Sequence, residues 1–261
     1  PEIYYAYSYF MLAKEVNPQI ITVLGGPFGS LSPEEALRCC PELDYVVMGE
    51  GEMTAVELLD KLGQGWTRNE MPQVQGLAFL DDEAFVQTKD RPHVDLDDLP
   101  QIDFDLVGTG DPRYTFIYYG RKGFRSPGWS VESSRGCNFG CRFCSKPIHW
   151  RRDIRFRSAE RVVEDMEIAV RKYGVRNFLM SSTCFLSDRG RLEDFIIEME
   201  KRNLKQYGMG YFLSLTRADD GRRTRDLVTR LHALGMEAAC FGGEVSDDEQ
   251  LASLHRQPTS R

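Results

Sequence analysis

Three cysteines stand close together in the middle of the chain, at Cys137, Cys141 and Cys144. Their C-x3-C-x2-C spacing lets one loop fold around one metal centre, and thiolates are the ligands of iron-sulfur clusters. Three such ligands would fix three irons of a [4Fe-4S] cubane and leave the fourth iron open to a substrate or cosubstrate. Gly136 and Gly140 suit a tight loop of this kind, because glycine adds no steric restriction and lets amides approach the sulfurs.

Two other interpretations of these cysteines stay open. A structural zinc site usually takes four protein ligands, and His149 is the only nearby candidate for the fourth. Inert buried thiols are the second alternative. The total of seven cysteines is odd and we expect no secretory signal, which favours metal or redox chemistry over a disulfide framework. We expect structural roles for the other four cysteines, with Cys184 as the first exception to consider: Cys39, Cys40, Cys184 and Cys240.

Length and composition indicate a soluble protein of two domains. The chain has 261 residues, 41% of them hydrophobic and 28% charged. No stretch approaches the roughly 18 apolar residues of a membrane helix, so we expect no membrane span. The first ten residues resemble no signal peptide and contain no initiator methionine, so we expect a cytoplasmic protein cut from a longer chain.

The formal net charge of -7 argues against a nucleic-acid partner, because phosphate binding normally requires a basic surface. The stretch from Lys146 to Arg161 is an exception, since it is locally basic. It is either a solvated loop and helix start or a surface that contacts an anionic cofactor or substrate.

The first part of the chain alternates helices and strands. Ser32 and Pro33 indicate a helix start, with Ser32 as the N-cap side chain. The order of elements implies a parallel sheet. The expected elements are a helix over 5–15, a strand over 20–24 closed by 25–27, a helix over 33–40, a strand over 44–48 and a helix over 54–62.

From residue 63 to 128 the pattern weakens, because prolines, glycines and an acidic run interrupt it. We interpret this stretch as a linker with short strands, including a hairpin over 76–87 that turns at Asp81 and Asp82. No repeat of solenoid type is visible.

Alternating strands and helices resume from residue 129. They predict the beginning of a (β/α) barrel, whose reactive groups gather at the carboxyl ends of the strands. We therefore expect an α/β protein with a partial Rossmann-like, parallel-sheet domain at 1–62 and an incomplete TIM-like barrel at 129–261, joined by the linker with short strands at 63–128. The expected strands of the barrel are 130–134, 177–181, 209–216 and 237–241, and its expected helices are 159–173, 189–202, 223–234 and one starting at 247.

The cysteine loop, with Phe143 just before the last cysteine, resembles the signature loop of radical S-adenosylmethionine (SAM) enzymes. The resemblance implies a [4Fe-4S] cluster on Cys137, Cys141 and Cys144 that binds SAM at its open iron. It also implies reductive cleavage of SAM to methionine and a 5'-deoxyadenosyl radical, which attacks a small-molecule substrate. The electron would come from an external one-electron reductant such as flavodoxin or ferredoxin.

The similarity extends to the cobalamin-dependent branch of this family. The chain resembles the second βα unit of that branch at residues 155–158, which lead into a helix, and at residues 177–185. Hydroxyl residues from Ser181 to Thr183 stand where that branch often has acids. Arg217 and Glu244 resemble its polar residues for SAM, although a surface ion pair or a helix-start acid would also explain them. The resemblance implies SAM contacts at Phe143, Ser181, Ser182, Arg217 and Glu244.

The first domain resembles the second half of the cobalamin-binding domain that precedes many enzymes of this branch. The glycine turn after residue 24 and the Gly-Glu-Gly-Glu run at 49–52 carry that similarity. Glycine there would let the backbone lie against the nucleotide tail of the cofactor, and glycines that only end strands are the alternative interpretation. The family's Asp, His and Gly motif for cobalt would precede Pro1. The implied cobalamin contacts are Gly25, Gly26, Pro27, Glu50 and Gly51.

The leading functional hypothesis is a cobalamin-associated radical SAM enzyme, with methyl transfer to an unreactive carbon as a candidate reaction. A radical SAM enzyme that catalyses a non-methylating rearrangement, cyclisation or oxidation is the second hypothesis. A non-catalytic iron-sulfur or zinc protein is the third. The substrate cannot be read from the residues.

Overall fold

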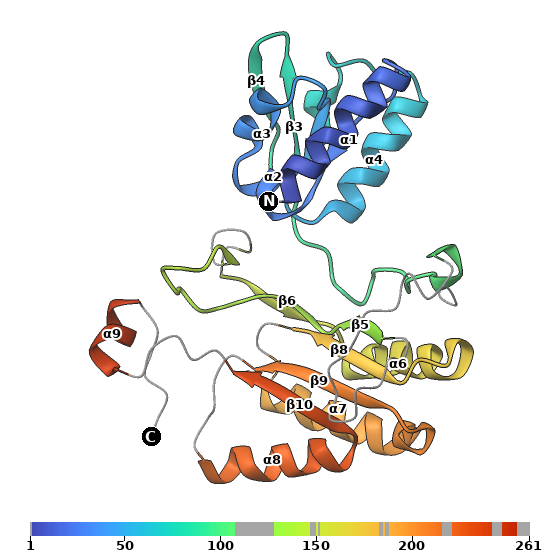
Figure 1. Ribbon diagram of the computed structural model, residues 1–261, viewed down its shortest axis with the longest axis vertical. Coiled ribbons are helices and arrows are strands. Elements are labelled where there is room, and N and C mark those ends of the chain that lie inside the picture. Colours follow the sequence, from blue (N-terminus) through green and yellow to red (C-terminus); the bar gives the residue numbers. More distant parts are fainter. Residues whose placement is uncertain are drawn as a thin grey trace. The chain divides into compact units, whose positions relative to one another are not determined.

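A computed structural model shows two compact units, Pro1–His93 and Val94–Arg261. It describes residues 2–107, 128–146, 150, 152–182, 185, 188–215, 221–241 and 247–254. Both units combine helices with a sheet (Figure 1).

The sheet of the first unit is mixed. Its described strands follow the order β1 (Val23–Leu24), β2 (Tyr45–Val47), β3 (Leu77–Asp81) and β4 (Ala84–Gln87). Strands β1 and β2 are parallel, whereas β3 is antiparallel to both β2 and β4. The helices of this unit are α1 (Glu2–Val16), α2 (Gly26–Leu31), α3 (Pro33–Cys39), α4 (Gly51–Gly63) and the short 3-10 helix η1 (Met71–Gln73).

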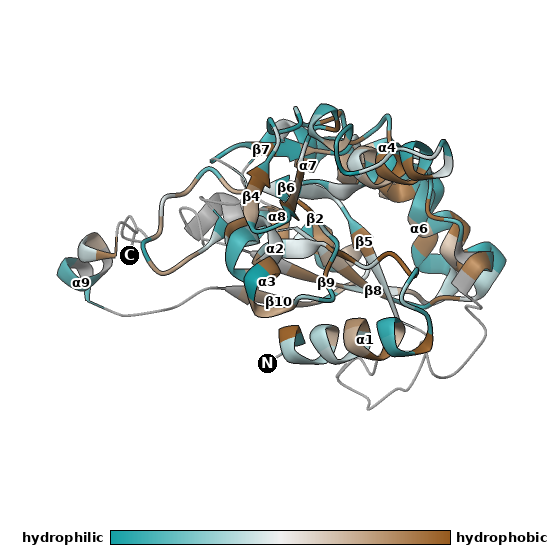
Figure 2. Ribbon diagram, turned by 90° about the horizontal axis from the view of Figure 1, so that it is seen from above, coloured by the Kyte–Doolittle hydropathy of each residue, from teal (hydrophilic) through white to brown (hydrophobic). Residues whose placement is uncertain are grey.

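Successive residues of β2 face opposite sides of this sheet, as the pleat requires. Val46 belongs to a core cluster with residues of α3, against which α1 packs Tyr7 and Phe10. Tyr45 and Val47 belong to a second cluster, which includes Leu58 of α4. Helices α1 and α4 therefore cover opposite faces, as Figure 2 shows.

The structure corrects several sequence expectations in the first unit. The strand expected over 20–24 is only Val23–Leu24, and the unexpected helix α2 follows at once. Ser32 makes no side-chain capping bond; it is also the C-cap of α2, where its N–H donates to the carbonyl of Phe28. Helix α4 begins at Gly51 instead of residue 54. The two strands expected from the sequence, β1 and β2, are parallel as predicted, and the antiparallel β3 makes the whole sheet mixed.

The hairpin that we assigned to a linker belongs to the first sheet. Residues Leu77, Ala78 and Phe79 of β3 are fully buried, and Val46 pairs with Ala78. The backbone of β3 pairs with β2, 32 residues earlier in the chain at Val46 and Ala78, and its apolar side chains pack into the two core clusters of this unit. The compact unit accordingly extends to His93 instead of residue 62.

The sheet of the second unit is parallel and runs in sequence order. Its described strands are β5 (Gly128–Glu132), β8 (Asn177–Ser181), β9 (Gly210–Leu215) and β10 (Met236–Phe241). Helices α6 (Ala159–Tyr173), α7 (Arg189–Arg202) and α8 (Gly221–Ala233) line one face of it (Figure 1). Sequential parallel strands with right-handed crossovers place all their helices on one side. The described strands form no closed barrel.

A short antiparallel hairpin of β6 (Ser134–Gly136) and β7 (Ile154–Phe156) follows β5, and β7 was not predicted. The segment after His93 lies against this part of the second unit. Arg155 donates from Nη1 to the Val94 carbonyl at 2.7 Å, and the Ser158 N–H donates to a carboxylate oxygen of Asp97 at 3.0 Å. The remaining elements are α9 (Asp248–Ser253) and the 3-10 helices η2 (Phe104–Val107) and η4 (Leu204–Tyr207).

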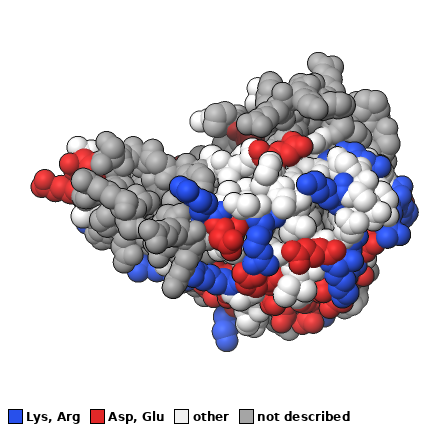
Figure 3. Space-filling model, turned by 90° about the horizontal axis from the view of Figure 1, so that it is seen from below, with Lys and Arg blue, Asp and Glu red and all other residues white. Residues whose placement is uncertain are grey.

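The core of the second unit packs α6 and α7 against the sheet. Val162, Met166 and Phe195 are fully buried with Phe178 and Tyr211 of the strands. One outer face of the molecule carries Lys and Arg among Asp and Glu, without a field of a single sign (Figure 3). Charge mixed in this way is typical of a solvated helix surface.

Candidate functional site

The cysteine loop begins directly after strand β6. Gly136, the last residue of β6, has a φ of 91°, and a Cβ there would lie 1.8 Å from the carbonyl oxygen of Asp153. Glycine is therefore required by both conformation and space. Cys137 follows it and is buried, with 6% of its surface exposed. The pairing of β6 with β7 thus fixes where the first thiol of the loop lies.

The other two thiols are half-buried. The Cys144 N–H donates to the Cys141 carbonyl at 3.2 Å, which closes a tight turn between them. The Arg142 N–H donates to the Leu254 carbonyl at 3.1 Å, so the loop also contacts the end of α9. All three cysteines are free of disulfides. Three thiols in one short loop, two of them accessible, are a donor set that fits an iron-sulfur cluster.

No three His, Cys, Asp or Glu side chains within the described residues form a group that could hold a single metal ion. A cubane offers a separate iron to each thiol, so its ligands need not meet at one point. His149, the candidate for a fourth zinc ligand, lies outside the described residues.

A cavity of about 300 Å³ adjoins both ends of the cysteine loop. Gly136 lines it immediately before Cys137, and Lys146 lines it two residues after Cys144. It also opens on the carboxyl ends of the parallel strands β5 and β8, which is where α/β enzymes place their reactive groups. The lining residues come from the strand ends and the hairpin: Glu132, Ser134, Arg135, Gly136, Lys146, Trp150, Leu179, Met180, Ser181 and Ser182.

The cavity wall is held by buried hydrogen bonds between strands. The hydroxyls of Ser134 and Ser182 lie 2.7 Å apart, and the Ser133 N–H donates to the Ser181 carbonyl at 3.1 Å. These bonds join the segment that leads into the cysteine loop to the end of β8. Arg135 donates to both carboxylate oxygens of Glu132, at 2.8 and 2.9 Å, so the wall carries a bidentate ion pair beside the hydroxyls.

The structure brings some of the predicted SAM residues together. Ser181 and Ser182 both line the cavity. Phe143 does not line it and is 54% exposed. Arg217 and Glu244 lie outside the described residues, as does Cys184.

Several lining residues were not found by sequence reasoning. Glu132, Ser134 and Arg135 stand between β5 and the cysteine loop, and Lys146 and Trp150 follow that loop. Their position near the end of a predicted strand is the one feature of the sequence that could have indicated them as site residues. Their convergence with β8 depends on pairing between segments about fifty residues apart, which no local pattern shows.

The residues predicted to contact cobalamin lie at the carboxyl ends of β1 and β2. These strands are parallel neighbours, so their ends share one edge of the sheet. Pro27 is in the first turn of α2, and Glu50 is the N-cap of α4, which begins at Gly51. A Cβ added at Gly25 or Gly26 would meet no atom within 4 Å, so the backbone is open to a close ligand. These residues therefore fit the side of a large cofactor.

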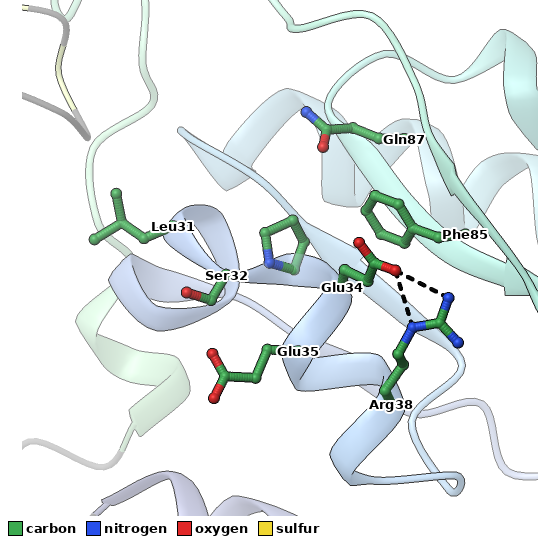
Figure 4. Close-up of a pocket in the computed structure, with 8 residues that line it drawn as sticks. Leu31, Ser32, Glu34, Glu35, Arg38, Phe85 and Gln87 are labelled. Carbon is green, nitrogen blue, oxygen red and sulfur yellow. Dashed lines mark hydrogen bonds and ion pairs between the residues drawn. The ribbon is translucent and has the colours of Figure 1, made fainter.

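The first unit also has a surface hollow of about 520 Å³ over α3 and β4 (Figure 4). Glu34 and Arg38 form an i,i+4 ion pair beside it, at 2.9 Å, with both side chains about half exposed. None of the predicted cobalamin residues lines this hollow. Its lining is Leu31, Ser32, Pro33, Glu34, Glu35, Arg38, Phe85 and Gln87.

Among the described residues, every helix is too short or too polar to cross a membrane.

Comparison with known proteins identifies the family. Residues 131–261 match the radical SAM superfamily, and residues 3–59 match the B12 binding domain. The first match covers half of the chain, and the chain therefore belongs to the radical SAM superfamily. The resemblance inferred from the cysteine loop and the glycine turns is confirmed at this level.

Two relatives illustrate the range of reactions in the family. The chain is 30% identical to an uncharacterized methyltransferase of Pyrococcus horikoshii, over 77% of this chain and 42% of the relative. It is also 30% identical to an anaerobic magnesium-protoporphyrin IX monomethyl ester cyclase of Rubrivivax gelatinosus, over 99% of this chain and 45% of the relative. The chain thus spans less than half the length of these relatives.

A solved structure shares the fold. The radical SAM methyltransferase TsrM from Kitasatospora setae, solved with tryptophan and a SAM analogue, aligns with a TM-score of 0.73 at 17% identity. The alignment covers 100% of this chain and 48% of that protein. The predicted α/β class is confirmed. Membership of the superfamily implies a [4Fe-4S] cluster and SAM as cofactors, and the B12 match implies cobalamin.

Proposed function

We propose that this chain contains the cluster-binding and SAM-binding parts of a cobalamin-associated radical SAM enzyme that acts on a small molecule. The observation that carries the proposal is the cavity beside the C-x3-C-x2-C loop. Its wall and the first cysteine belong to one continuous segment, from Glu132 to Cys137. None of the three cysteines lines the cavity itself, and a ligand in it contacts Gly136, which directly precedes Cys137.

The wall offers partners for the polar end of SAM. Ser181 is exposed, and the wall also has the Glu132–Arg135 pair and Lys146. Carboxylate and hydroxyl oxygens can accept from an ammonium group, and basic side chains can donate to a carboxylate. The Ser182 hydroxyl already bonds to Ser134, so we assign Ser182 to holding the wall and Ser181 to the cosubstrate.

Within this proposal the protein's residues bind and orient the groups that react. Cys137, Cys141 and Cys144 would hold the [4Fe-4S] cluster, and the open edge at Gly25, Gly26, Pro27, Glu50 and Gly51 would contact cobalamin. The chemistry these cofactors supply when bound is one-electron cleavage of the SAM sulfonium and carriage of a methyl group. The electron comes from an external donor of the flavodoxin or ferredoxin class.

Methyl transfer is the leading reaction, in line with the methyltransferase relative. The cyclase relative, which aligns with 99% of this chain, supports a non-methylating reaction as the second candidate. SAM labelled in its methyl group separates the two. Label in the product supports methyl transfer, and unlabelled product with release of 5'-deoxyadenosine supports the second reaction.

The experiment that tests the proposal is electron paramagnetic resonance of the full chain. The protein is purified without oxygen, reconstituted with iron and sulfide, reduced, and measured with and without SAM. We expect a [4Fe-4S] signal that shifts on adding SAM and is lost in Cys141→Ala. Cys39→Ala is the matched control, because Cys39 is exposed and belongs to the first unit. Tight zinc in place of iron, or a signal indifferent to SAM, would contradict the proposal.

A further inference from the structure

Arg191, near the start of α7, is a buried arginine whose side chain donates to backbone carbonyls. Its exposed fraction is 8%. It donates from Nε to the Arg157 carbonyl at 3.1 Å and from Nη2 to the Ser133 carbonyl at 2.8 Å. Both acceptors are far from it in sequence, so the side chain joins three separate segments of the second unit.

The two carbonyls belong to the segments that flank the hairpin. Ser133 stands between β5 and β6, and Arg157 directly follows β7. The Arg157 N–H donates to the same Ser133 carbonyl at 3.1 Å. Strand β6 leads from Ser133 through the cavity wall to Cys137, four residues further on. Arg191 therefore fixes both ends of the hairpin from which the cysteine loop extends.

Asp188 and Asp97 act on Arg191 only from beyond ion-pair distance, and burial outweighs their effect on its pKa. Among the described residues no carboxylate lies at ion-pair distance from its guanidinium. The guanidinium instead lies over the rings of Phe156 and Phe185, at 5.0 and 5.5 Å from their centroids. Burial lowers the pKa of Arg191 to about 10, so the group stays cationic at neutral pH. A buried charge is costly in free energy unless it is hydrogen-bonded. The planar guanidinium holds its N–H donors in fixed directions, so the carbonyls that accept from it are held in place.

We propose that Arg191 is a positioning residue for the cysteine loop, acting through the carbonyls of Ser133 and Arg157 to set where Cys137 and the cavity wall lie. The inference rests on the proposed function, because the cluster is what gives the position of Cys137 a chemical role. The contacts of Arg191 with Ser133 and Arg157 involve only residues of this chain. Lysine keeps the charge but has a single nitrogen and lacks the planar fork, so it should satisfy one carbonyl and fix the loop less well.

The first test uses the full chain without metal, kept reduced. The rate of alkylation of Cys137 by iodoacetamide is followed by mass spectrometry in the wild type and in Arg191→Met, Arg191→Lys and Arg202→Met. Arg202 is a matched control at the other end of α7, where it pairs with Glu167 at 2.6 Å. Thermal unfolding of each variant is recorded in parallel, and rates are measured well below its midpoint.

We expect Arg191→Met to raise the alkylation rate of Cys137 about tenfold, since two charge-assisted hydrogen bonds that oppose local opening are lost. Arg191→Lys should give a smaller increase, of about threefold. Arg202→Met should stay within about twofold of the wild type, even where its unfolding midpoint falls. An unchanged rate in Arg191→Met, or an equal rise in Arg202→Met, would overturn the inference. If Arg191→Met does not fold, the alkylation rate of Cys137 in Arg191→Lys, compared with the wild type and Arg202→Met, decides the question.

The second test uses the reconstituted, reduced chain. The shift that SAM causes in the electron paramagnetic resonance signal should be lost or reduced in Arg191→Met, restored in part in Arg191→Lys and kept in Arg202→Met. A full shift in Arg191→Met would contradict the positioning role. If the wild type itself shows no response to SAM, the proposed function fails, and the alkylation rates still decide whether Arg191 positions the loop.

Discussion

The hydroxyls of Ser134 and Ser182 lie 2.7 Å apart in the buried wall of the cavity. Ser134 is the first residue of β6 and Ser182 directly follows β8, so this bond joins the approach to the cysteine loop to the central sheet. Ser134 lies two residues before Gly136, which directly precedes Cys137. The serine pair therefore links the packing of the sheet to the position of the proposed cluster ligand.

Ser182→Ala should destabilise the second unit by about 1–3 kcal/mol, because it leaves the buried Ser134 hydroxyl without its partner. Removing both hydroxyls should cost less than the sum of the two single changes, with a coupling of about 1 kcal/mol. Urea unfolding of Ser134→Ala, Ser182→Ala and the double variant measures this cycle. Strictly additive values would show that the two hydroxyls do not depend on each other.

Gly136→Ala should prevent the hairpin from closing. The φ of 91° and the approach of the Asp153 carbonyl both exclude a side chain, and we expect a loss of about 3 kcal/mol or more. Thermal unfolding and iron content after reconstitution measure the effect.

Gly174→Ala is the control for this change. Gly174 ends α6 with a φ of 67°, but an added Cβ there meets no atom within 4 Å. It should cost only about 1 kcal/mol and leave iron content unchanged. Equal effects of the two variants would mean that backbone conformation alone, without the contact to Asp153, determines the cost.

The sequence predicts the second unit well where signals are local. Helix α6 matches its expected bounds because Ser158 accepts from the Arg161 N–H at one end and Gly174 adopts a left-handed conformation at the other. Strand β7 was missed because it has only three half-buried residues, with Arg155 between two apolar side chains. It becomes a strand through pairing with β6, across the whole cysteine loop.

The candidate site shows the same difference between residues with a local signal and residues that depend on distant contacts. The thiols could be found by spacing, because all three lie within one loop. The cavity wall and Arg191 could not, since each depends on contacts between segments that are distant in the chain, such as the bond from Arg191 to Ser133. A buried arginine in a helix has no sequence pattern that separates it from a solvated one.

Gly25→Leu should weaken cobalamin binding without harming the fold. Gly25 has an extended backbone with φ of −125°, and a Cβ there meets no protein atom within 4 Å, so a larger side chain adds no strain. If the backbone approaches the cofactor at this edge, leucine would occupy that space, and we expect affinity to fall at least about tenfold, by steric exclusion. Titration with hydroxocobalamin, followed by absorbance, measures it.

Gly63→Leu is the matched control, since Gly63 also has open space around it and ends α4. Its affinity for hydroxocobalamin should equal that of the wild type. Equal affinity in Gly25→Leu would remove the turn after β1 from the proposed cobalamin contacts.

Tyr211 should make the second unit lose stability at alkaline pH. Its side chain is fully buried and donates to the Leu231 carbonyl at 2.9 Å, and burial raises the pKa of this phenol above its usual range. In the unfolded chain a tyrosine loses its proton near pH 10. Above that pH the unfolded state binds fewer protons than the folded state, so the free energy of unfolding must fall as pH rises.

Tyr211→Phe removes this titration and also the hydrogen bond. We expect the variant to be less stable by about 1 kcal/mol at pH 8, and the difference from the wild type to shrink between pH 10 and 11. Urea unfolding at these pH values measures both effects, and the comparison with the wild type cancels the contribution of the other tyrosines. A difference that stays constant with pH would mean that the Tyr211 phenol loses its proton as readily in the folded chain as in the unfolded one.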